Sequence, residues 1–514
     1  MTSHARVAAR VGFMLLAALA IIGIPACSQP PRNDGMIVVA VANGPSNLDP
    51  GVGLDETSQK LHTLLFSSLL KIDESLRVVP DLAIRFERPD PRTYIAEVRH
   101  GVHFHDGREL TSADVAYTYR RFLDPAFVSG RKGAYRMIAS VDAVDRYTVA
   151  FHLKEPSGSF PVNLVMGIVP AGTGPEAARH PIGSGPYQIV DFVADDHVTL
   201  RAFPGYFEGP PRNAGLLFRV VPDDTMRGLE LRKGTVDIVV NDLAPDIVQA
   251  LKTDAHLGVT TTLGTDYAYL GFNLREPLLQ DVRLRQAIGY AIDRQAIVDY
   301  LRRGLATPAI GIIPPMSWAF EPNVFQFTHD PARAKALLDA AGYPDPDGDG
   351  PLPRLHLSLK TSTAEAYRLQ AAVIQRNLAD VGIAVDVRSY EFATLFADVL
   401  KGNVQLYTLQ WVGVTDPDML RRVFYSTQTP PAGFNRGYYK NVKVDQLIDG
   451  ASAAPDDATR RKLYGEAQQL IAADAPYVSL WYKTNVAVFQ STLSGVHLSP
   501  IAEFTFLKDV ERRR

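Results

Sequence analysis

From Met36 to the C-terminus, short apolar runs rich in β-branched residues alternate with longer stretches whose apolar residues recur at helical spacing. Residues 37–41 are typical of a buried strand, whereas residues 56–70 and 282–301 are typical of amphipathic helices. Because strands and helices alternate along the whole chain, the sequence predicts an α/β fold. A length of 514 residues, with 46% hydrophobic residues, indicates two or three domains.

Two helix starts carry local capping signals. Thr111 and Asp114 form a variant of the capping box, with aspartate in place of glutamate, and predict a helix that begins after Thr111. Asp330 is followed by a proline, the preferred residue at the first helical position, and Gly342 follows the apolar pattern. The second signal therefore predicts a helix over residues 331–341.

The N-terminus has the pattern of a secretion signal. Arg6 and Arg10 precede an apolar run over residues 11–24, and a small-residue segment leads to Cys27. The apolar run is 14 residues long, which is shorter than the roughly 20 residues of a membrane-spanning helix. Residues 1–26 are therefore predicted to be a signal peptide that is removed from the mature protein.

Cys27 is the only cysteine of the chain, so an intramolecular disulfide and a cysteine-based metal cluster are both excluded. The segment that ends at Cys27 resembles the lipobox of bacterial lipoproteins, which implies lipidation of Cys27 and a tether over residues 27–35. An ordinary signal peptide is the alternative. Without residues 1–26 the chain has 51 basic and 56 acidic residues, a net charge of −5, which argues against nucleic acid as a partner.

The sequence contains none of the common nucleophile, zinc, phosphate-loop or dinucleotide motifs. His103 and His105 have possible metal spacing, but the Asp-Gly pair after them favours a strand-to-turn role. Residues 345–350 are similar to the start of a calcium loop, yet the twelfth position holds His356 and not glutamate. We therefore expect no enzyme activity, no cofactor and no metal site.

Ten short strings in the order and spacing of one family run through the mature chain. Together they resemble the family 5 extracellular solute-binding proteins of peptide and nickel importers. The strings are residues 65–70, 79–83, 99–107, 111–115, 183–187, 231–237, 269–273, 281–288, 334–338 and 411–418.

This resemblance implies a periplasmic-binding-protein-like fold, in which two α/β lobes joined by a hinge close on a ligand and an additional domain is inserted in the first lobe. The implied division is lobe one at 36–64, 183–273 and 485–514, the extra domain at 65–182, and lobe two at 274–484.

The resemblance also implies where the ligand binds. Trp411 begins the family's pocket loop, in which peptide binders carry an acidic residue that pairs with the ligand's ammonium group. The third residue after Trp411 is Val414, so a peptide amine would lose this partner. Asp416 could replace it, or it could cap the next helix. The expected ligand contacts are Asn43, Ser46, Tyr267, Tyr269, Asn273, Trp411, Val412, Gly413, Val414, Thr415, Asp416, Trp481 and Tyr482. Core packing is the alternative role for the aromatic residues, and a hinge role is the alternative for Asn273.

The predicted function is that of a substrate-binding lipoprotein of an ABC importer. It would act as a monomer outside the cytoplasm, in the periplasm or at the outer face of the cell membrane, and deliver a peptide or another small organic ligand to the permease subunits. The same scaffold could instead carry an opine, an oligosaccharide or a glutathione-like ligand. A hydrolase and a ligand sensor are the alternatives from other functional classes.

Overall fold

A computed structural model describes residues 35–513, with the exception of 349, 432 and 455. The predicted signal peptide, Cys27 and nearly all of the tether lie outside these residues. In the described part of the chain, no helix is long and apolar enough to span a membrane.

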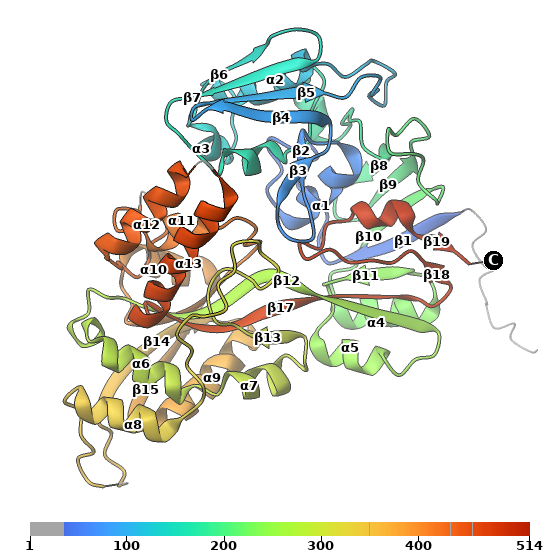
Figure 1. The fold of residues 1–514 in the computed structure, drawn as a ribbon. Coiled ribbons are helices and arrows are strands. Elements are labelled where there is room, and N and C mark those ends of the chain that lie inside the picture. Colours follow the sequence, from blue (N-terminus) through green and yellow to red (C-terminus); the bar gives the residue numbers. More distant parts are fainter. Residues whose placement is uncertain (1–34, 349, 432, 455, 514) are drawn as a thin grey trace, which may run out of the picture.

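One sheet of eleven strands runs through the molecule, in the order β15-β14-β16-β12-β17-β11-β1-β10-β9-β8, with β13 paired to β17 (Figure 1). We call the end that holds β1 and β8 to β11 lobe one, and the end that holds β13 to β16 lobe two. The strands are β1 (Met36–Val41), β8 (Tyr187–Val193), β9 (His197–Ala202), β10 (Gly215–Val220), β11 (Ile238–Val240), β12 (Leu257–Phe272), β13 (Ala306–Pro308), β14 (Leu355–Ser362), β15 (Ile383–Tyr390), β16 (Leu406–Trp411) and β17 (Tyr477–Gln490).

Two long antiparallel strands, β12 and β17, belong to both lobes. They pair from Leu257 with Gln490 at one end to Gly271 with Tyr477 at the other. Their register shifts between Leu263 and Tyr267, where the ladder passes from lobe one to lobe two. Such an irregularity breaks the regular pairing and bends the strands, so it marks the hinge of the molecule.

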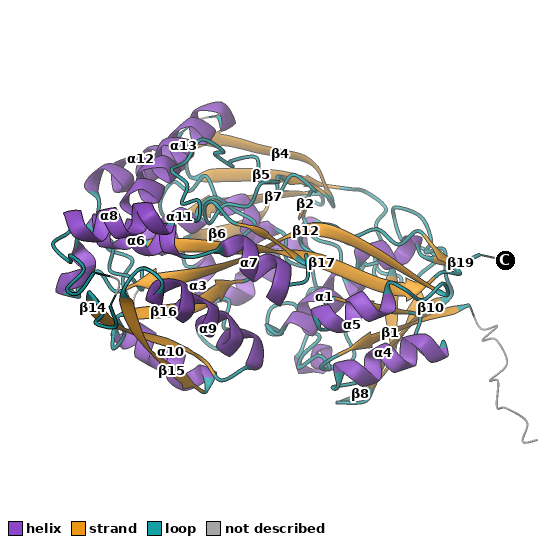
Figure 2. Ribbon diagram, turned by 90° about the horizontal axis from the view of Figure 1, so that it is seen from below, coloured by secondary structure: helices purple, strands orange, loops and turns teal. Residues whose placement is uncertain are grey.

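Helices cover both faces of the sheet in an α/β arrangement, as Figures 1 and 2 show. In lobe one, α4 and α5 pack on Val38 and Ala40 of β1, while α1 packs on the opposite face. The helices are α1 (Glu56–Leu65), α4 (Asp224–Lys233), α5 (Pro245–Leu251), α6 (Val282–Ala291), α7 (Arg294–Ala296), α8 (Pro331–Ala340), α9 (Glu365–Ala379), α10 (Phe392–Lys401), α11 (Met419–Phe424), α12 (Val442–Ala453) and α13 (Asp457–Asp474).

A separate four-stranded sheet, in the order β4-β5-β7-β6, forms an additional domain with its own core at the top of Figure 1. The domain follows α1 in the chain and returns to lobe one before β8. The residue boundaries given above for the lobes stay a prediction. The elements of the extra domain are β2 (Leu70–Ile72), β3 (Val78–Pro80), β4 (Ala83–Asp90), β5 (Thr93–Val98), α2 (Ser112–Arg120), α3 (Lys132–Tyr135), β6 (Ile138–Ala143) and β7 (Thr148–Leu153).

Both capping signals are confirmed. The Asp114 carboxylate accepts a hydrogen bond from the Thr111 backbone N–H at 2.9 Å, and Asp330 accepts one from the Arg333 backbone N–H at 2.9 Å. These signals are local, so tertiary packing does not override them. Each helix therefore begins where the sequence predicts.

The prediction of one helix over residues 282–301 is wrong. The first helix, α6, ends at Ala291, and α7 begins after Asp293, whose carboxylate accepts the Ala296 backbone N–H at 2.9 Å. Ile292 is extended, yet Ile292 and Ile297 lie in the same core cluster as the buried face of α6. The apolar periodicity continues across the break because both pieces pack on one core.

The cleft between the two lobes

The carboxyl ends of parallel strands from both lobes meet at the hinge. In lobe one, β1 is parallel to β10 and β11, and β11 ends at Val240, opposite Ala487 of β17. In lobe two, β14 is parallel to β15 and β16, and β16 ends at Trp411, opposite Tyr267 of β12. Open α/β sheets bind ligands outside the carboxyl ends of their strands. The topology therefore places the candidate site between the lobes, beside the register shift.

The lobe-one wall of this cleft begins directly after β1. Asn43 is exposed there and lines a cavity of about 180 Å³, together with charged residues of α1. Ser46 donates its backbone N–H to the Asp55 carboxylate at 3.2 Å, and Asp55 also caps α1 by accepting the Ser58 N–H at 2.8 Å. The cap therefore fixes the loop that carries Asn43 and Ser46.

Charged residues from both lobes face each other across the hinge. Lys60 Nζ lies 2.6 Å from the Glu56 carboxylate in α1, and Lys483 Nζ lies 3.8 Å from Asp266 in the crossing strands. Burial opposes ionisation of Glu56, but the positive charges of Lys60 and Lys483 outweigh it and lower the Glu56 pKa. Lys483 of the crossing strands thus acts on a residue of lobe one.

A second cavity of about 220 Å³ lies on the other side of the crossing strands, where Asn241 of lobe one meets Arg302 and Lys483. The Arg302 guanidinium lies 4.5 Å from the centre of the Trp481 ring, and its Nε has no hydrogen-bond partner among the described residues. Buried guanidinium groups are normally paired. Arg302 therefore has an unused donor beside the cavity.

The lobe-two wall is the loop after Trp411. Val412 is 72% exposed, and the exposed Gly413 donates its backbone N–H to the Asp266 carboxylate at 3.0 Å. Val414 is only 1% exposed because its side chain joins the lobe-two core, and Thr415 is half-buried. The side chain three residues after Trp411 thus points away from solvent.

The other predicted contacts have protein partners in this structure. The Tyr267 hydroxyl lies 2.7 Å from Ser479 Oγ, and Tyr269 stacks on Tyr477 with ring centres 4.1 Å apart. The Tyr482 hydroxyl donates to the Gly311 carbonyl at 2.6 Å, and Trp481 Nε1 donates to Gln370 Oε1 at 2.8 Å. Asn273 Nδ2 donates to the Val404 carbonyl at 2.9 Å. Ligand contact by these side chains stays a prediction.

The Asp416 carboxylate accepts the Asp418 backbone N–H at 2.7 Å, directly before α11. Burial raises the pKa of Asp416. Burial and the neighbouring charge of Asp416 raise the pKa of Asp418 to about 6. Asp416 therefore forms a turn at the start of α11, and ionising both carboxyls is unfavourable.

Replacing Asp418 with asparagine should remove a pH dependence of stability. A carboxyl whose folded pKa is raised stabilises the fold below its unfolded pKa, and this stabilisation is lost as the pH rises through about 6. At pH 8, D418N should therefore raise the free energy of unfolding by about 2 kcal/mol relative to wild type, with little change at pH 4. Urea unfolding at the two pH values checks this. D386N, at an exposed carboxylate, is the control and should leave the pH dependence of stability as in wild type. If D418N raised the free energy of unfolding equally at both pH values, the raised pKa of Asp418 would be contradicted.

Sequence reasoning missed the charged residues of the cleft. These residues belong to no motif and come from separate segments of the chain. They are Glu56, Lys60, Asp266, Arg302 and Lys483. Only the crossing of β12 and β17 brings them together. The one available signal was the position of Glu56 and Lys60 in the first helix after β1, at the carboxyl end of a strand.

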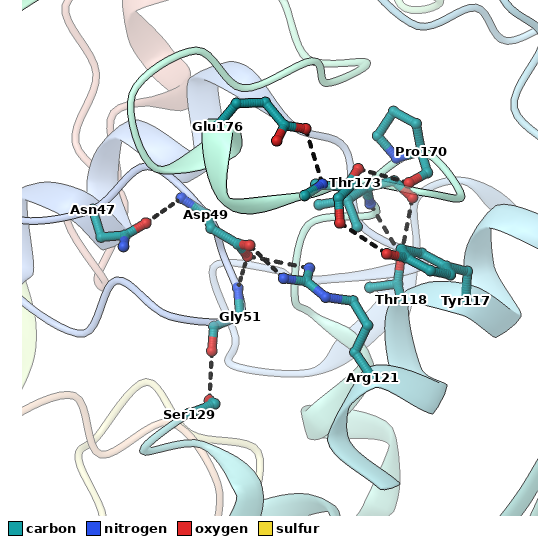
Figure 3. Close-up of polar contacts among 12 residues, drawn as sticks. Asn47, Asp49, Gly51, Tyr117, Thr118, Arg121, Ser129, Pro170, Thr173 and Glu176 are labelled. Carbon is teal, nitrogen blue, oxygen red and sulfur yellow. Dashed lines mark hydrogen bonds and ion pairs between the residues drawn. The ribbon is translucent and has the colours of Figure 1, made fainter. Parts of the chain in front are cut away.

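A cavity of about 780 Å³ lies elsewhere, where lobe one joins the extra domain. At its base Arg121, directly after α2, reaches the Asp49 carboxylate in a buried ion pair (Figure 3). The predicted ligand contacts do not line this cavity, and its buried charges are already paired. Its lining residues are Asn47, Asp49, Val52, Tyr117, Arg120, Arg121, Asp124, Ala126, Phe127, Val128, Thr173, Gly174, Pro175 and Ala178.

Known proteins share this architecture along nearly the whole chain. Residues 77–431 match the family described as bacterial extracellular solute-binding proteins, family 5 middle. The chain is 31% identical to the oligopeptide-binding protein AppA of Bacillus subtilis, over 91% of this chain and 90% of that protein. It is 30% identical to the glutathione-binding protein GsiB of Salmonella typhi, over 91% of this chain and 93% of that protein.

Solved structures of related proteins have the same fold. The structure of AppA from Bacillus subtilis in complex with a nonapeptide matches with a TM-score of 0.75 at 28% identity, over 93% of this chain and 99% of that chain. CtaP from Listeria monocytogenes has the same fold, with a TM-score of 0.84 at 24% identity, over 94% of this chain and 100% of that chain.

The two lobes, the crossing strands and the cleft at the strand ends define a two-lobe solute-binding protein, and the predicted fold class is confirmed. The chain belongs to the family 5 bacterial extracellular solute-binding proteins. The predicted role as a solute-binding protein of an ABC importer is thereby confirmed as well.

Proposed function

We propose that this protein captures a peptide, or a related small organic ligand, in the cleft between its lobes and delivers it to the permease of its importer. The observation that carries the proposal is the meeting of strand carboxyl ends from both lobes at one hinge. AppA is described as oligopeptide-binding and GsiB as glutathione-binding, which supports a ligand with peptide-like groups.

Contacts between the lobes support capture by closure. Arg303 of lobe two lies 2.7 Å from the Asp246 carboxylate of α5, and Arg77 of the extra domain lies 3.0 Å from Asp457 of α13. These pairs are partly exposed, and such pairs contribute little energy each. Because these pairs stabilise the approach of the lobes only weakly, a ligand that contacts both walls would shift the population towards a closed form.

The loop after Trp411 argues against recognition of a free α-amine at its third position. Val414 lies in the core, and the Asp416 carboxylate is used by the Asp418 backbone N–H. An ammonium group at the third position of this loop would find no unshared carboxylate, because the Asp266 carboxylate beside Gly413 already lies 3.8 Å from Lys483 Nζ. We therefore expect a ligand whose amine is blocked, distant or absent, and we place it against Asn43, Trp411 and Val412.

The cell location is part of the same proposal. We propose that residues 1–26 direct export, that Cys27 is lipidated, and that a monomer acts at the outer face of the membrane as a carrier without enzymatic activity. Two or more acyl chains would anchor the protein stably, since each buried methylene contributes about 0.8 kcal/mol.

Native mass spectrometry of residues 28–514 tests the proposal. We expect the purified protein to carry a bound molecule that leaves on mild unfolding, with a mass within the range of short peptides or similar organic acids. Matched samples with peptides that carry a free or an acetylated amino terminus should show preference for the acetylated form. A ligand-free protein that binds no member of such a panel would contradict the proposed ligand class.

A further inference from the structure

One buried cation in lobe two has no counter-charge. Arg436, in the loop between α11 and α12, is 5% exposed. It forms no ion pair with any carboxylate of the described residues. Within the described part of the chain, its one side-chain hydrogen bond runs from Nη1 to the Tyr269 hydroxyl at 3.2 Å, and its Nε is buried without a partner.

Three other buried arginines of this chain have several acceptors or a carboxylate partner. Arg285 donates to four backbone carbonyls, among them that of Leu279 at 2.7 Å. Arg227 donates to three carbonyls, and Arg121 pairs with Asp49. A buried charge without a partner costs several kcal/mol. Arg436 therefore differs from these three arginines, which have acceptors for most of their donors.

Aromatic rings surround the guanidinium. Its carbon lies 4.2 Å from the ring centre of Trp411, 4.9 Å from that of Phe396 and 5.7 Å from that of Phe434. Such rings offset part of the desolvation of a cation, but they accept no in-plane hydrogen bond. They hold the guanidinium in place and leave its Nε–H without an acceptor.

A second unused donor lies in the same cluster. The indole Nε1 of Trp411 is buried without a partner, like the Nε of Arg436. Next to these donors, Val412 is 72% exposed and Phe434 is 43% exposed, at the carboxyl end of β16. Two buried donors without partners, bordered by exposed apolar side chains, complement a small anion with an apolar substituent.

We propose that Arg436 and Trp411 form a carboxylate subsite, in which a ligand's carboxylate accepts hydrogen bonds from the guanidinium and the indole N–H while an adjoining apolar group packs on Phe434 and Val412. A carboxylate is the acceptor that fits a guanidinium with two parallel hydrogen bonds. The inference rests on the proposed function and names the ligand class as organic acids with an apolar group next to the carboxylate.

Isothermal titration with isovalerate and its uncharged amide tests the subsite without knowledge of the natural ligand. We expect wild type to bind isovalerate at millimolar concentration and not the amide. Arg436→Met should weaken isovalerate binding by about 30-fold, since a charge-assisted hydrogen-bonded pair is lost. Trp411→Phe, which keeps an aromatic ring and removes one donor, should weaken it by about 5-fold. Arg376→Met, at an exposed arginine of α9 outside the cluster, should bind as wild type does.

Thermal unfolding of the same variants separates binding from folding. Because an unpaired buried cation destabilises the protein, Arg436→Met should unfold at the wild-type temperature or above it while it loses isovalerate. Three results would each overturn the subsite. They are a lower unfolding temperature of Arg436→Met with unchanged binding, equal binding of isovalerate and its amide, and no response of wild type to isovalerate. Native mass spectrometry distinguishes this from a failure of the proposed function: a natural ligand retained equally by wild type and Arg436→Met leaves the function intact and removes the subsite.

Discussion

Replacing Gly183 with alanine should prevent the protein from reaching its fold. A Cβ atom at Gly183 would lie 1.9 Å from the backbone oxygen of Leu65, and one at Gly185 would lie 2.5 Å from the backbone oxygen of Leu64. Backbone at the end of α1 cannot move away without disturbing the core of lobe one. We expect G183A to lose at least about 4 kcal/mol of unfolding free energy, measured by soluble yield and urea unfolding.

Gly133 provides the matched control. It lies in α3, and a Cβ there would have no atom within 4 Å. The G133A variant should be as stable as wild type or gain up to about 1 kcal/mol, because alanine is the better helix former. If G183A and G133A unfolded at the same urea concentration, close backbone approach would not be the reason for glycine at position 183.

The same glycine segment explains a histidine that the sequence left ambiguous. The Gly183 backbone N–H donates to Nδ1 of His105 at 3.2 Å, and His105 Nε2 lies 3.1 Å from the Gly185 carbonyl oxygen. Burial lowers the pKa of His105 to about 4, so the ring is neutral at pH 7. His105 thus joins the extra domain to the segment that returns to lobe one, which agrees with the strand-to-turn interpretation of residues 103–107.

The parts of the fold that the sequence predicted are those that local chemistry determines. The cap at Asp330 needs only the next few residues, and its helix begins where expected. The break at Ile292 was missed because the apolar spacing continues into the next helix. Periodicity reports which residues are buried, but it does not report whether the backbone between them is continuous.

The candidate site was less predictable because its residues meet only through topology. Trp411 and Asn43 follow strand ends and could be placed at the cleft from the family strings. Arg436 could not be placed, since no residue near it in sequence indicates that its charge is buried without a partner. Tyr267 and Tyr269 are two residues apart in β12 and lie on one face of the strand. This spacing alone does not distinguish a core face from a ligand-facing one.

Removing the Asp49 carboxylate should destabilise the junction between lobe one and the extra domain. Asp49 accepts the Gly51 backbone N–H at 2.8 Å and pairs with Arg121, whose Nη1 lies 3.3 Å from it, and both side chains are nearly buried (Figure 3). D49A leaves the Arg121 charge buried without a partner, so we expect a loss of about 3 to 5 kcal/mol in urea unfolding at pH 7.

Two further variants identify the cause of that loss. In D49A/R121M no unpaired charge remains, and apolar replacement of both partners is often close to neutral, so the double variant should recover much of the stability that D49A loses. E87A removes the exposed pair with Arg85 and should change the free energy of unfolding by less than about 1 kcal/mol. If D49A were no more destabilising than E87A, the buried pair would not hold the junction together. The loop after β1 leads from the cleft to Asp49, so this pair also anchors the cleft wall that carries Asn43.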